Sequence, residues 1–310
     1  MRIFYSDIFD LPLPEGHRFP MRKYSLLHER VAAGALVPRS NLLVAPTASR
    51  EEIQRAHTAA YVKRVFAGEL TAREQRVIGF PWSPNLVERS CQSVGATIEA
   101  CRSALRDGVS VNLAGGTHHA YSDRGQGFCV FNDVAVAARA VQAEGLARRI
   151  VVIDCDVHQG NGTAAIFADD PSVFTFSIHG ANNFPFHKEA SDLDVALPDG
   201  ADDLTYLEAL HDGLRRLPLP EFDLVVYLAG ADPFVGDTLG RLAVSKRGLA
   251  ERDRAVFQAC RTAGLPVAVV MAGGYARHVE DIVDIHFATV QIASEFAGDQ
   301  RSDALVTSYA

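Results

Sequence analysis

The chain has 310 residues, of which 48% are hydrophobic and 22% charged, and its formal net charge at pH 7 is −8. This balance is that of a globular protein with enough apolar residues for a sizeable core. The acidic excess argues against direct binding of nucleic acid, which needs a basic surface, and no apolar run is long enough to span a membrane.

The N-terminal segment and the cysteines bear on where the protein works. Asp7 and Asp10 interrupt the first residues before the apolar core of a signal peptide could form, so we expect a cytoplasmic protein. The cysteines are odd in number and include no Cys-x-x-Cys pair, which argues against a disulfide framework or a cysteine zinc site. We expect most of them to be buried as small apolar residues: Cys91, Cys101, Cys129, Cys155 and Cys260.

The N-terminal region, which ends near residue 80, carries the weakest structural pattern. Leu42–Val44 has the composition of an edge strand, and residues 50–66 are predicted to form one helix. The rest of this region is expected to consist of surface loops. Long loops in a compact domain are often functional.

From about residue 84 onward, helical and strand patterns alternate. The predicted helices cover residues 85–106, 132–144, 204–217, 245–263 and 281–296. The predicted strands cover residues 109–113, 150–154, 172–177, 224–228 and 267–271. Because these strands are apolar throughout, they indicate a parallel sheet that is buried on both faces. The predicted fold class is therefore α/β, with one domain over residues 1–310 and a central parallel sheet flanked by helices.

Ligands of open parallel sheets bind at the carboxyl ends of the strands, and four of the predicted strands end in residues that can carry chemistry. The first runs into two glycines and then His118 and His119. Glycine lets the backbone turn tightly or approach a ligand closely. Imidazoles exchange protons near neutral pH, so this strand end is a candidate catalytic segment.

The second strand end carries Asp154, Asp156 and His158, spaced two residues apart. If the strand continues to His158, all three side chains point to the same face of the sheet. Two carboxylates and an imidazole on one buried face are costly unless a cation joins them. The pattern therefore predicts a metal site.

The third and fourth strand ends extend this prediction. Asp232 follows the strand at 224–228 and would complete a metal site of two carboxylates and one imidazole. Tyr275 follows the strand at 267–271, where its hydroxyl could donate a hydrogen bond to a developing oxyanion. A single acid after a strand is often only a turn residue, and a single tyrosine is often only a packed surface residue. Because four strand ends carry such residues, we expect a functional site.

These residues suffice for hydrolysis of an amide. Zinc accepts imidazole and carboxylate ligands and keeps one coordination position open in catalytic sites, where it polarises a carbonyl and acidifies bound water. His119 would take a proton from the water and return one to the leaving amine, while His118 would help to hold the water. Histidines at metal sites need orienting partners, and Asp154 and Asn161 are candidates.

Five motifs, in this order along the chain, resemble those of the zinc-dependent histone deacetylase family, and the resemblance covers roughly residues 50–290. They are Gly-Gly-Thr-His-His (115–119), Gly-Phe-Cys-Val-Phe-Asn-Asp (127–133), Asp-Cys-Asp-Val-His-Gln-Gly-Asn-Gly-Thr (154–163), Ala-Gly-Ala-Asp-Pro (229–233) and Ala-Gly-Gly-Tyr (272–275). The runs 122–129 and 236–242 are similar to the class IV branch of the family and its bacterial relatives.

The resemblance implies the arginase–deacetylase fold and a single catalytic domain. It assigns one Zn²⁺ per chain to the ligands derived above. It makes His119 the general base and acid and His118 its electrostatic partner. It makes Tyr275 the oxyanion donor. It also implies that Asp154 orients His118 and that Asn161 contacts His119.

The resemblance also implies a narrow tunnel for the acylated side chain and a second ion. The implied tunnel residues are Gly127, Phe128, Phe184 and Gly274. Relatives bind a structural potassium ion, which would lie near Asp154 and Ser177 here.

The chain departs from the family pattern at two positions. Asn161 stands where some members carry an acid, which weakens stabilisation of a protonated His119, and Gln159 stands where many members carry histidine. Neither change removes a catalytic group. Residues 14–20 resemble an entrance loop of the family.

The sequence leaves the substrate open. The first expectation is the acyl-lysine of a protein, bearing either an acetyl or a long fatty acyl group. The alternative is an acetylpolyamine or another acylated small amine, for which acids at the tunnel mouth would be needed; the candidates are Glu189, Asp192, Asp194 and Asp237. A non-catalytic protein that binds acyl-amines or metal, and a binuclear hydrolase like arginase, are further alternatives. The oligomeric state is not predicted.

Overall fold

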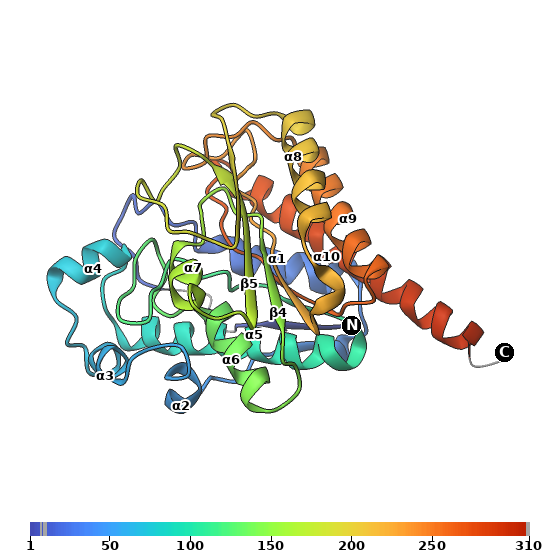
Figure 1. Ribbon diagram of the computed structural model, residues 1–310. Helices are drawn as coiled ribbons and strands as arrows, with labels where there is room; N and C mark the ends of the chain where they lie inside the picture. The colour runs from blue at the N-terminus through green and yellow to red at the C-terminus, as the bar shows by residue number, and fades with distance from the viewer. Residues whose placement is uncertain (7, 9–10, 308–310) are drawn as a thin grey trace.

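The structure is a computed structural model, and it describes residues 1–6, 8 and 11–307. Asp7 and Asp10, on which the expectation about the N-terminal segment depends, lie outside the described residues. The chain forms one α/β domain around an eight-stranded sheet (Figure 1). Within the described part, no helix has the length and apolar character that crossing a membrane requires.

All neighbouring strands of the sheet are parallel, and their order is β2-β1-β3-β8-β7-β4-β5-β6. The strands are β1 (Arg2–Tyr5), β2 (Leu42–Val44), β3 (Val109–Asn112), β4 (Ile150–Asp154), β5 (Val173–Gly180), β6 (Leu193–Leu197), β7 (Leu224–Leu228) and β8 (Val267–Val270). The predicted edge strand β2 is at an edge. The four strands whose ends carry chemistry, β3, β8, β7 and β4, are consecutive in the sheet, so their carboxyl ends meet.

Helices cover both faces of the sheet. The α-helices are α1 (Arg22–Gly34), α2 (Arg50–Ile53), α3 (Ala59–Ala67), α4 (Ala72–Ile78), α5 (Pro84–Asp107), α6 (Asp133–Ala143), α7 (Asn161–Phe167), α8 (Asp203–Arg216), α9 (Lys246–Thr262) and α10 (Val279–Thr307), and the 3₁₀ helices are η1 (Arg39–Asn41) and η2 (Leu219–Glu221). Helices α1, α8, α9 and α10 pack on one face, and α5, α6 and α7 on the other (Figure 1).

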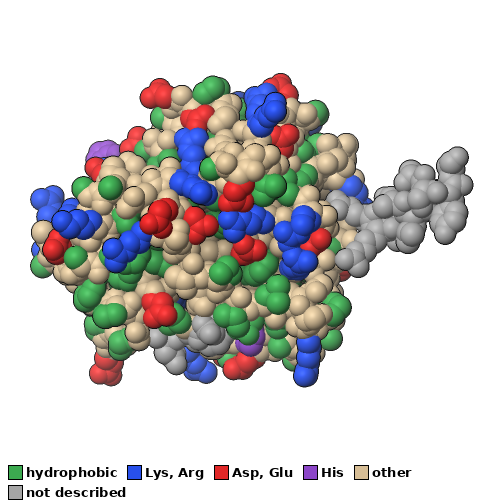
Figure 2. All heavy atoms as spheres, turned by 90° about the horizontal axis from the view of Figure 1, so that it is seen from below, with side chains coloured by type: hydrophobic (Ala, Val, Ile, Leu, Met, Phe, Trp, Pro, Cys, Tyr) green, Lys and Arg blue, Asp and Glu red, His purple; other side chains and the backbone are tan. Residues whose placement is uncertain are grey.

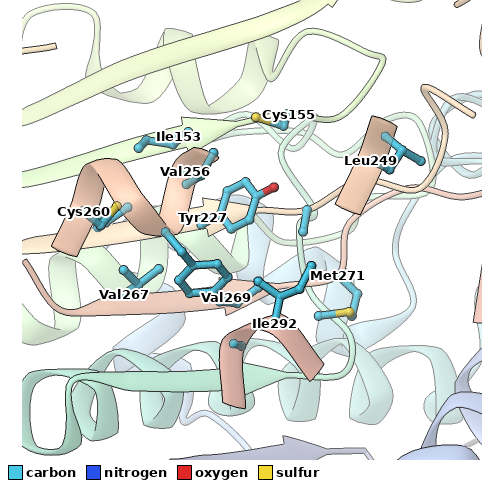
Figure 3. Packing of buried hydrophobic residues seen from close by; sticks show 14 of the residues in the cluster. Ile153, Cys155, Tyr227, Leu249, Val256, Cys260, Val267, Val269, Met271 and Ile292 are labelled. Carbon is cyan, nitrogen blue, oxygen red and sulfur yellow. The ribbon is translucent and has the colours of Figure 1, made fainter. Parts of the chain in front are cut away.

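The strands contribute alternate side chains to the two cores. Val151 and Ile153 of β4 face one core, while Ile150 and Val152 face the other. Figure 3 shows the first core, in which Tyr227 of β7 lies among side chains of β8, α9 and α10. Burial on both faces is why residues 150–153 of β4 and all of β8 are apolar.

Local signals set the helix starts. The Asn132 side chain accepts a hydrogen bond from the Ala135 N–H and caps α6, near the start of the helix predicted at 132–144. Ser83 caps α5 by accepting from the Leu86 N–H, and Pro84 occupies the first helical position.

The N-terminal region up to residue 80 differs most from the prediction. The single helix predicted at 50–66 is wrong: α2 ends at Ile53, and Thr58 caps a separate helix, α3. Between them, buried His57 turns inward and accepts a hydrogen bond from the Asn132 N–H at 2.8 Å. The predicted surface loops also contain β1, α1 and α4.

The face seen in Figure 2 carries basic and acidic side chains interspersed, without a region of a single sign. That face therefore offers no basic stripe of the kind that nucleic-acid binding requires.

A buried ion pair on α9 gives a stability prediction. Arg252 and Asp253 are fully buried, and Arg252 Nε donates to Asp253 Oδ1 at 2.8 Å. The Asp253 carboxylate also accepts from the Tyr227 and Thr289 hydroxyls. Asp253→Ala strands the arginine charge, so we expect the free energy of unfolding in urea to fall by about 3–5 kcal/mol.

The control for this change lies one residue further along the same helix. Arg254 is exposed and pairs with Glu295 at the surface, so Arg254→Ala should cost less than about 1 kcal/mol. Equal losses in the two variants would contradict the argument from burial.

Candidate active site

The tandem histidines reach the site through two glycines after β3. Gly115 and Gly116 have φ values of 81° and 72°, in the left-handed region that favours glycine. A Cβ on Gly116 would lie 2.4 Å from the Ala272 Cα. The loops that follow β3 and β8 therefore touch, and this contact brings His118 and His119 near Tyr275.

His118 is a buried imidazole that is paired with a carboxylate. Its Nδ1 donates to Asp154 Oδ2 at 2.6 Å. Burial lowers the pKa of His118, but the carboxylates of Asp154 and Asp156 outweigh burial and raise it to about 9. These carboxylates therefore favour the protonated form of His118.

His119 has the opposite electrostatic character. Its Nδ1 lies 2.7 Å from Asn161 Oδ1. Burial, followed by the positive charges of His118 and His158, holds the pKa of His119 well below its ordinary value. A neutral imidazole in this position is free to accept a proton.

Asp156, His158 and Asp232 form one buried cluster, and their potential ligand atoms lie within 4.8 Å of one another. The conditional expectation that Asp154 shares their face is wrong, because β4 ends at Asp154. The Asp154 carboxylate accepts from the Asp156 N–H, and that of Asp156 accepts from the His158 N–H. These hydrogen bonds direct the Asp154 side chain toward His118, and they place Asp156 and His158 in the loop that follows β4.

The cluster has the features of a cation site. The Gly273 N–H donates a hydrogen bond to one oxygen of Asp156, and the Val157 N–H donates to one oxygen of Asp232. The other oxygen of Asp232, Oδ2, is buried 3.2 Å from His158 Nδ1 and has no hydrogen bond from any described residue. Burial, and then the charge of Asp156, raise the pKa of Asp232 to about 7. A divalent cation would relieve this repulsion.

Gly273 shows how little space surrounds the cluster. A Cβ at this position would lie 1.9 Å from Asp232 Oδ2 and 2.5 Å from Asp156 Oδ2. Only glycine lets the loop after β8 pass this close to both carboxylates.

A cavity of about 500 Å³ leads from the surface to this cluster and reaches His119, His158 and Tyr275. Gly127 and Phe128 line it, and so does Phe184, whose ring centroid lies 4.9 Å from that of His119. Gly274, predicted in the tunnel, does not line it. Gly274 is buried against Ile282, and its carbonyl accepts a hydrogen bond from Lys23 Nζ.

Tyr275 lies partly buried beside the cluster. Its backbone N–H donates to Asp237 Oδ2 at 2.6 Å, and its ring lies 5.8 Å from that of Phe128. Burial, and then the carboxylates of Asp156 and Asp232, raise the pKa of Tyr275 well above its ordinary value. The phenol therefore stays protonated and can donate a hydrogen bond.

Residues 14–20, which resemble an entrance loop, contribute to the mouth of the site, and two further residues near the site were not found from the sequence. Arg18 lines the large cavity, and Phe19 packs on Phe128 and Tyr275, so residues 14–20 do border the mouth. A smaller cavity of about 50 Å³ beyond the cluster is lined partly by Lys23 and Arg89. Arg89 falls within the helix predicted at 85–106, whereas Lys23 lies in α1, which the sequence did not predict.

An Asp–His–Asp cluster that could hold a metal ion lies with an imidazole and a phenol at one end of a cavity. This arrangement is the one expected of a metal-assisted hydrolase. The family profile described as "Histone deacetylase domain" matches residues 17–290. The chain therefore belongs to the histone deacetylase family of hydrolases, as the motifs indicated.

Relatives extend over most of the chain. An uncharacterized protein of Picosynechococcus sp. is 46% identical, covering 92% of this chain and 95% of the relative. Histone deacetylase 2 of Arabidopsis thaliana is 29% identical, with coverages of 91% and 77%. Polyamine deacetylase HDAC10 of Homo sapiens is 33% identical, with coverages of 85% and 42%.

Solved structures share the fold. The crystal structure of an HDAC homolog from Aquifex aeolicus superposes with a TM-score of 0.81 at 24% identity, covering 96% of this chain and 84% of that chain. The expected arginase–deacetylase fold is thus confirmed. Assignment to the class IV branch stays a prediction.

Proposed function

We propose that the protein is a zinc-dependent amide hydrolase that removes a short acyl group from an acylated amine, above all acyl-lysine. The observation that carries the proposal is the convergence, in one cavity, of the Asp156–His158–Asp232 cluster with His119 and Tyr275. Each of these groups has a distinct role in the reaction.

The donor set of the cluster suits zinc. Asp156 and Asp232 each offer one carboxylate oxygen, and His158 offers Nδ1, which lies 3.0 and 3.2 Å from those two carboxylates. Three protein ligands of this kind are the pattern of a catalytic site with an open position. Zinc bound there would polarise the substrate carbonyl and lower the pKa of a water. The potassium ion expected near Asp154 and Ser177 stays a prediction that nothing further supports.

The two histidines divide the proton chemistry. With Nδ1 of His119 engaged by Asn161, its Nε2 is the atom that takes a proton from the attacking water and delivers it to the leaving amine. His118 is already protonated through its pairing with Asp154, so it contributes positive charge instead of accepting a proton. The Tyr275 hydroxyl donates a hydrogen bond to the oxyanion as charge develops.

The charges at the mouth favour acyl-lysine over acetylpolyamine. Arg18 and Arg241 line the cavity, and no Asp or Glu among the described residues does so. The four acids considered for a polyamine site are engaged elsewhere: Glu189 with Tyr121, Asp192 with Thr175, Asp194 with Gln159, and Asp237 with backbone N–H groups. A cationic polyamine would meet repulsion, whereas an acylated lysine side chain is neutral.

The small cavity beyond the cluster favours a short acyl group. Its volume of about 50 Å³ has space for only a few waters, and Lys23 and Arg89 line it. A fatty acyl chain would have to lie against the charged groups of Lys23 and Arg89, which are buried and would lose polar surroundings to the alkyl chain. Acetyl fits this space, and a myristoyl chain does not.

A substrate panel tests the proposal. We expect the zinc-loaded protein to hydrolyse acetyl-lysine peptides with a kcat/KM at least about tenfold above that for myristoyl-lysine peptides, acetylputrescine or acetylspermidine, since a tenfold ratio needs only about 1.4 kcal/mol. The measurement is the release of free amine from each substrate, with the metal-free protein as control.

Each of the other possible results would favour a different function or contradict part of the proposal. A preference for acetylpolyamines, consistent with the name of the human relative, would move the function to small-molecule metabolism. A preference for myristoyl would contradict the argument from the small cavity. Bound zinc without turnover of any substrate would favour a non-catalytic binding protein.

A further inference from the structure

A row of hydrogen bonds leads from His119 out to the protein surface. Asn161 Oδ1 faces His119 Nδ1 at 2.7 Å, and Asn161 Nδ2 donates to the Tyr121 hydroxyl oxygen at 3.0 Å. The Tyr121 hydroxyl in turn donates to Glu189 Oε1 at 2.9 Å. Neither Tyr121 nor Glu189 lines either cavity of the site.

The donor and acceptor of each hydrogen bond in this row are determined by Glu189, the residue at the surface end of the row. An ionised Glu189 can only accept hydrogen bonds, so the single hydroxyl proton of Tyr121 is directed to it. The Tyr121 oxygen must then accept from Asn161, which places the amide nitrogen of Asn161 on that side. The amide oxygen is left facing His119, so the neutral imidazole must carry its proton on Nδ1 and keep Nε2 bare.

The row is held in place by Gln159. Its side-chain oxygen accepts from the Glu189 N–H at 2.9 Å, and its side-chain nitrogen donates to the Glu189 carbonyl at 2.7 Å. The Arg124 guanidinium lies 3.7 Å from the Tyr121 ring centroid. Exposed Glu189 is thus fixed through its backbone, and the two departures from the family pattern, Gln159 and Asn161, belong to one row.

We propose that Tyr121 and Glu189 are positioning residues that fix the tautomer of His119. An acid at position 161 would need no such help, because a carboxylate only accepts. An asparagine can flip its amide end for end, and it would then donate to Nδ1 and force the proton onto Nε2, where the imidazole could no longer act as a base. The catalytic consequence rests on the proposed function, whereas the tautomer itself does not.

The test is Tyr121→Phe in the zinc-loaded protein. We expect kcat for the best substrate to fall about tenfold or more, with KM and zinc content unchanged. Nitrogen-15 NMR of His119, assigned with His119→Gln, should show Nδ1–H in the unsubstituted protein and a substantial population of Nε2–H in the variant. Glu189→Gln should change both readouts in the same direction, whereas Glu221→Gln, at a surface carboxylate paired with Arg149, should change neither.

Rescue separates positioning from a merely structural role. Adding Asn161→Asp to Tyr121→Phe should restore Nδ1–H and most of kcat, because the carboxylate accepts without any outer partner. An unchanged tautomer in Tyr121→Phe, or a loss of kcat that Asn161→Asp does not recover, would overturn the proposal. If no substrate is hydrolysed at all, the proposed function fails, and the NMR comparison still decides the tautomer.

Discussion

Asp232→Asn is expected to lower the zinc content from one ion per chain to nearly none and to reduce amide hydrolysis by at least about 10³-fold. The substitution removes one of two anionic ligands, including the buried Oδ2, which has no hydrogen bond from any described residue. Loss of the metal forfeits several kcal/mol of transition-state stabilisation, and about 1.4 kcal/mol corresponds to a tenfold change in rate. Metal analysis of the purified protein and initial rates measure the two effects.

Two controls accompany this variant. Asp212→Asn removes an exposed carboxylate on α8 and should alter neither quantity. A chelator should inactivate the unsubstituted protein, and one equivalent of zinc should restore it. Two ions per chain would point instead to a binuclear, arginase-like site, and full activity of Asp232→Asn would remove the metal from the mechanism.

Tyr275→Phe is expected to lower kcat by roughly 10²–10³-fold, the usual loss for one oxyanion donor. The hydroxyl is the only atom removed, and the backbone N–H of residue 275 keeps its bond to Asp237. KM and zinc content should therefore stay within about twofold, because the donor acts mainly in the transition state. A variant that keeps kcat within about threefold would show that another group stabilises the oxyanion.

The central part of the sheet was predictable because β3, β8, β7, β4 and β5 each carry their own sequence signal. β4 and β7 begin and end at the predicted residues, since an apolar run bounded by polar residues is the mark of a strand buried on both faces. β1 has no such signal, because it is short and includes Arg2. Its identity as a strand comes from pairing with β2 and β3, which are both distant in the sequence.

Some residues of the candidate site could be found from local sequence, and others could not. His118, His119, Asp156, His158 and Tyr275 follow recognisable strand ends, so local sequence was enough to select them. Lys23 and Arg89 reach the site from helices α1 and α5, and only the packing of those helices determines their position.

The contacts of single side chains were the least accessible to sequence. The bond from Asn161 to Tyr121 joins two residues that are far apart along the chain and share no motif. Gly274 was misplaced because its neighbour Tyr275 turns into the cavity while its own carbonyl turns toward Lys23.

The strand order has a consequence for how the protein is made. β8 and β7 are inserted between β3 and β4 but are synthesised after both. A growing chain can pair β3 with β1 and β4 with β5. The other edge of each of these two strands has no partner until β7 and β8 have left the ribosome. Such edges are sites of misassociation, so chaperone contact during synthesis should concentrate on β3 and β4, and acquisition of the metal should be among the last events of maturation.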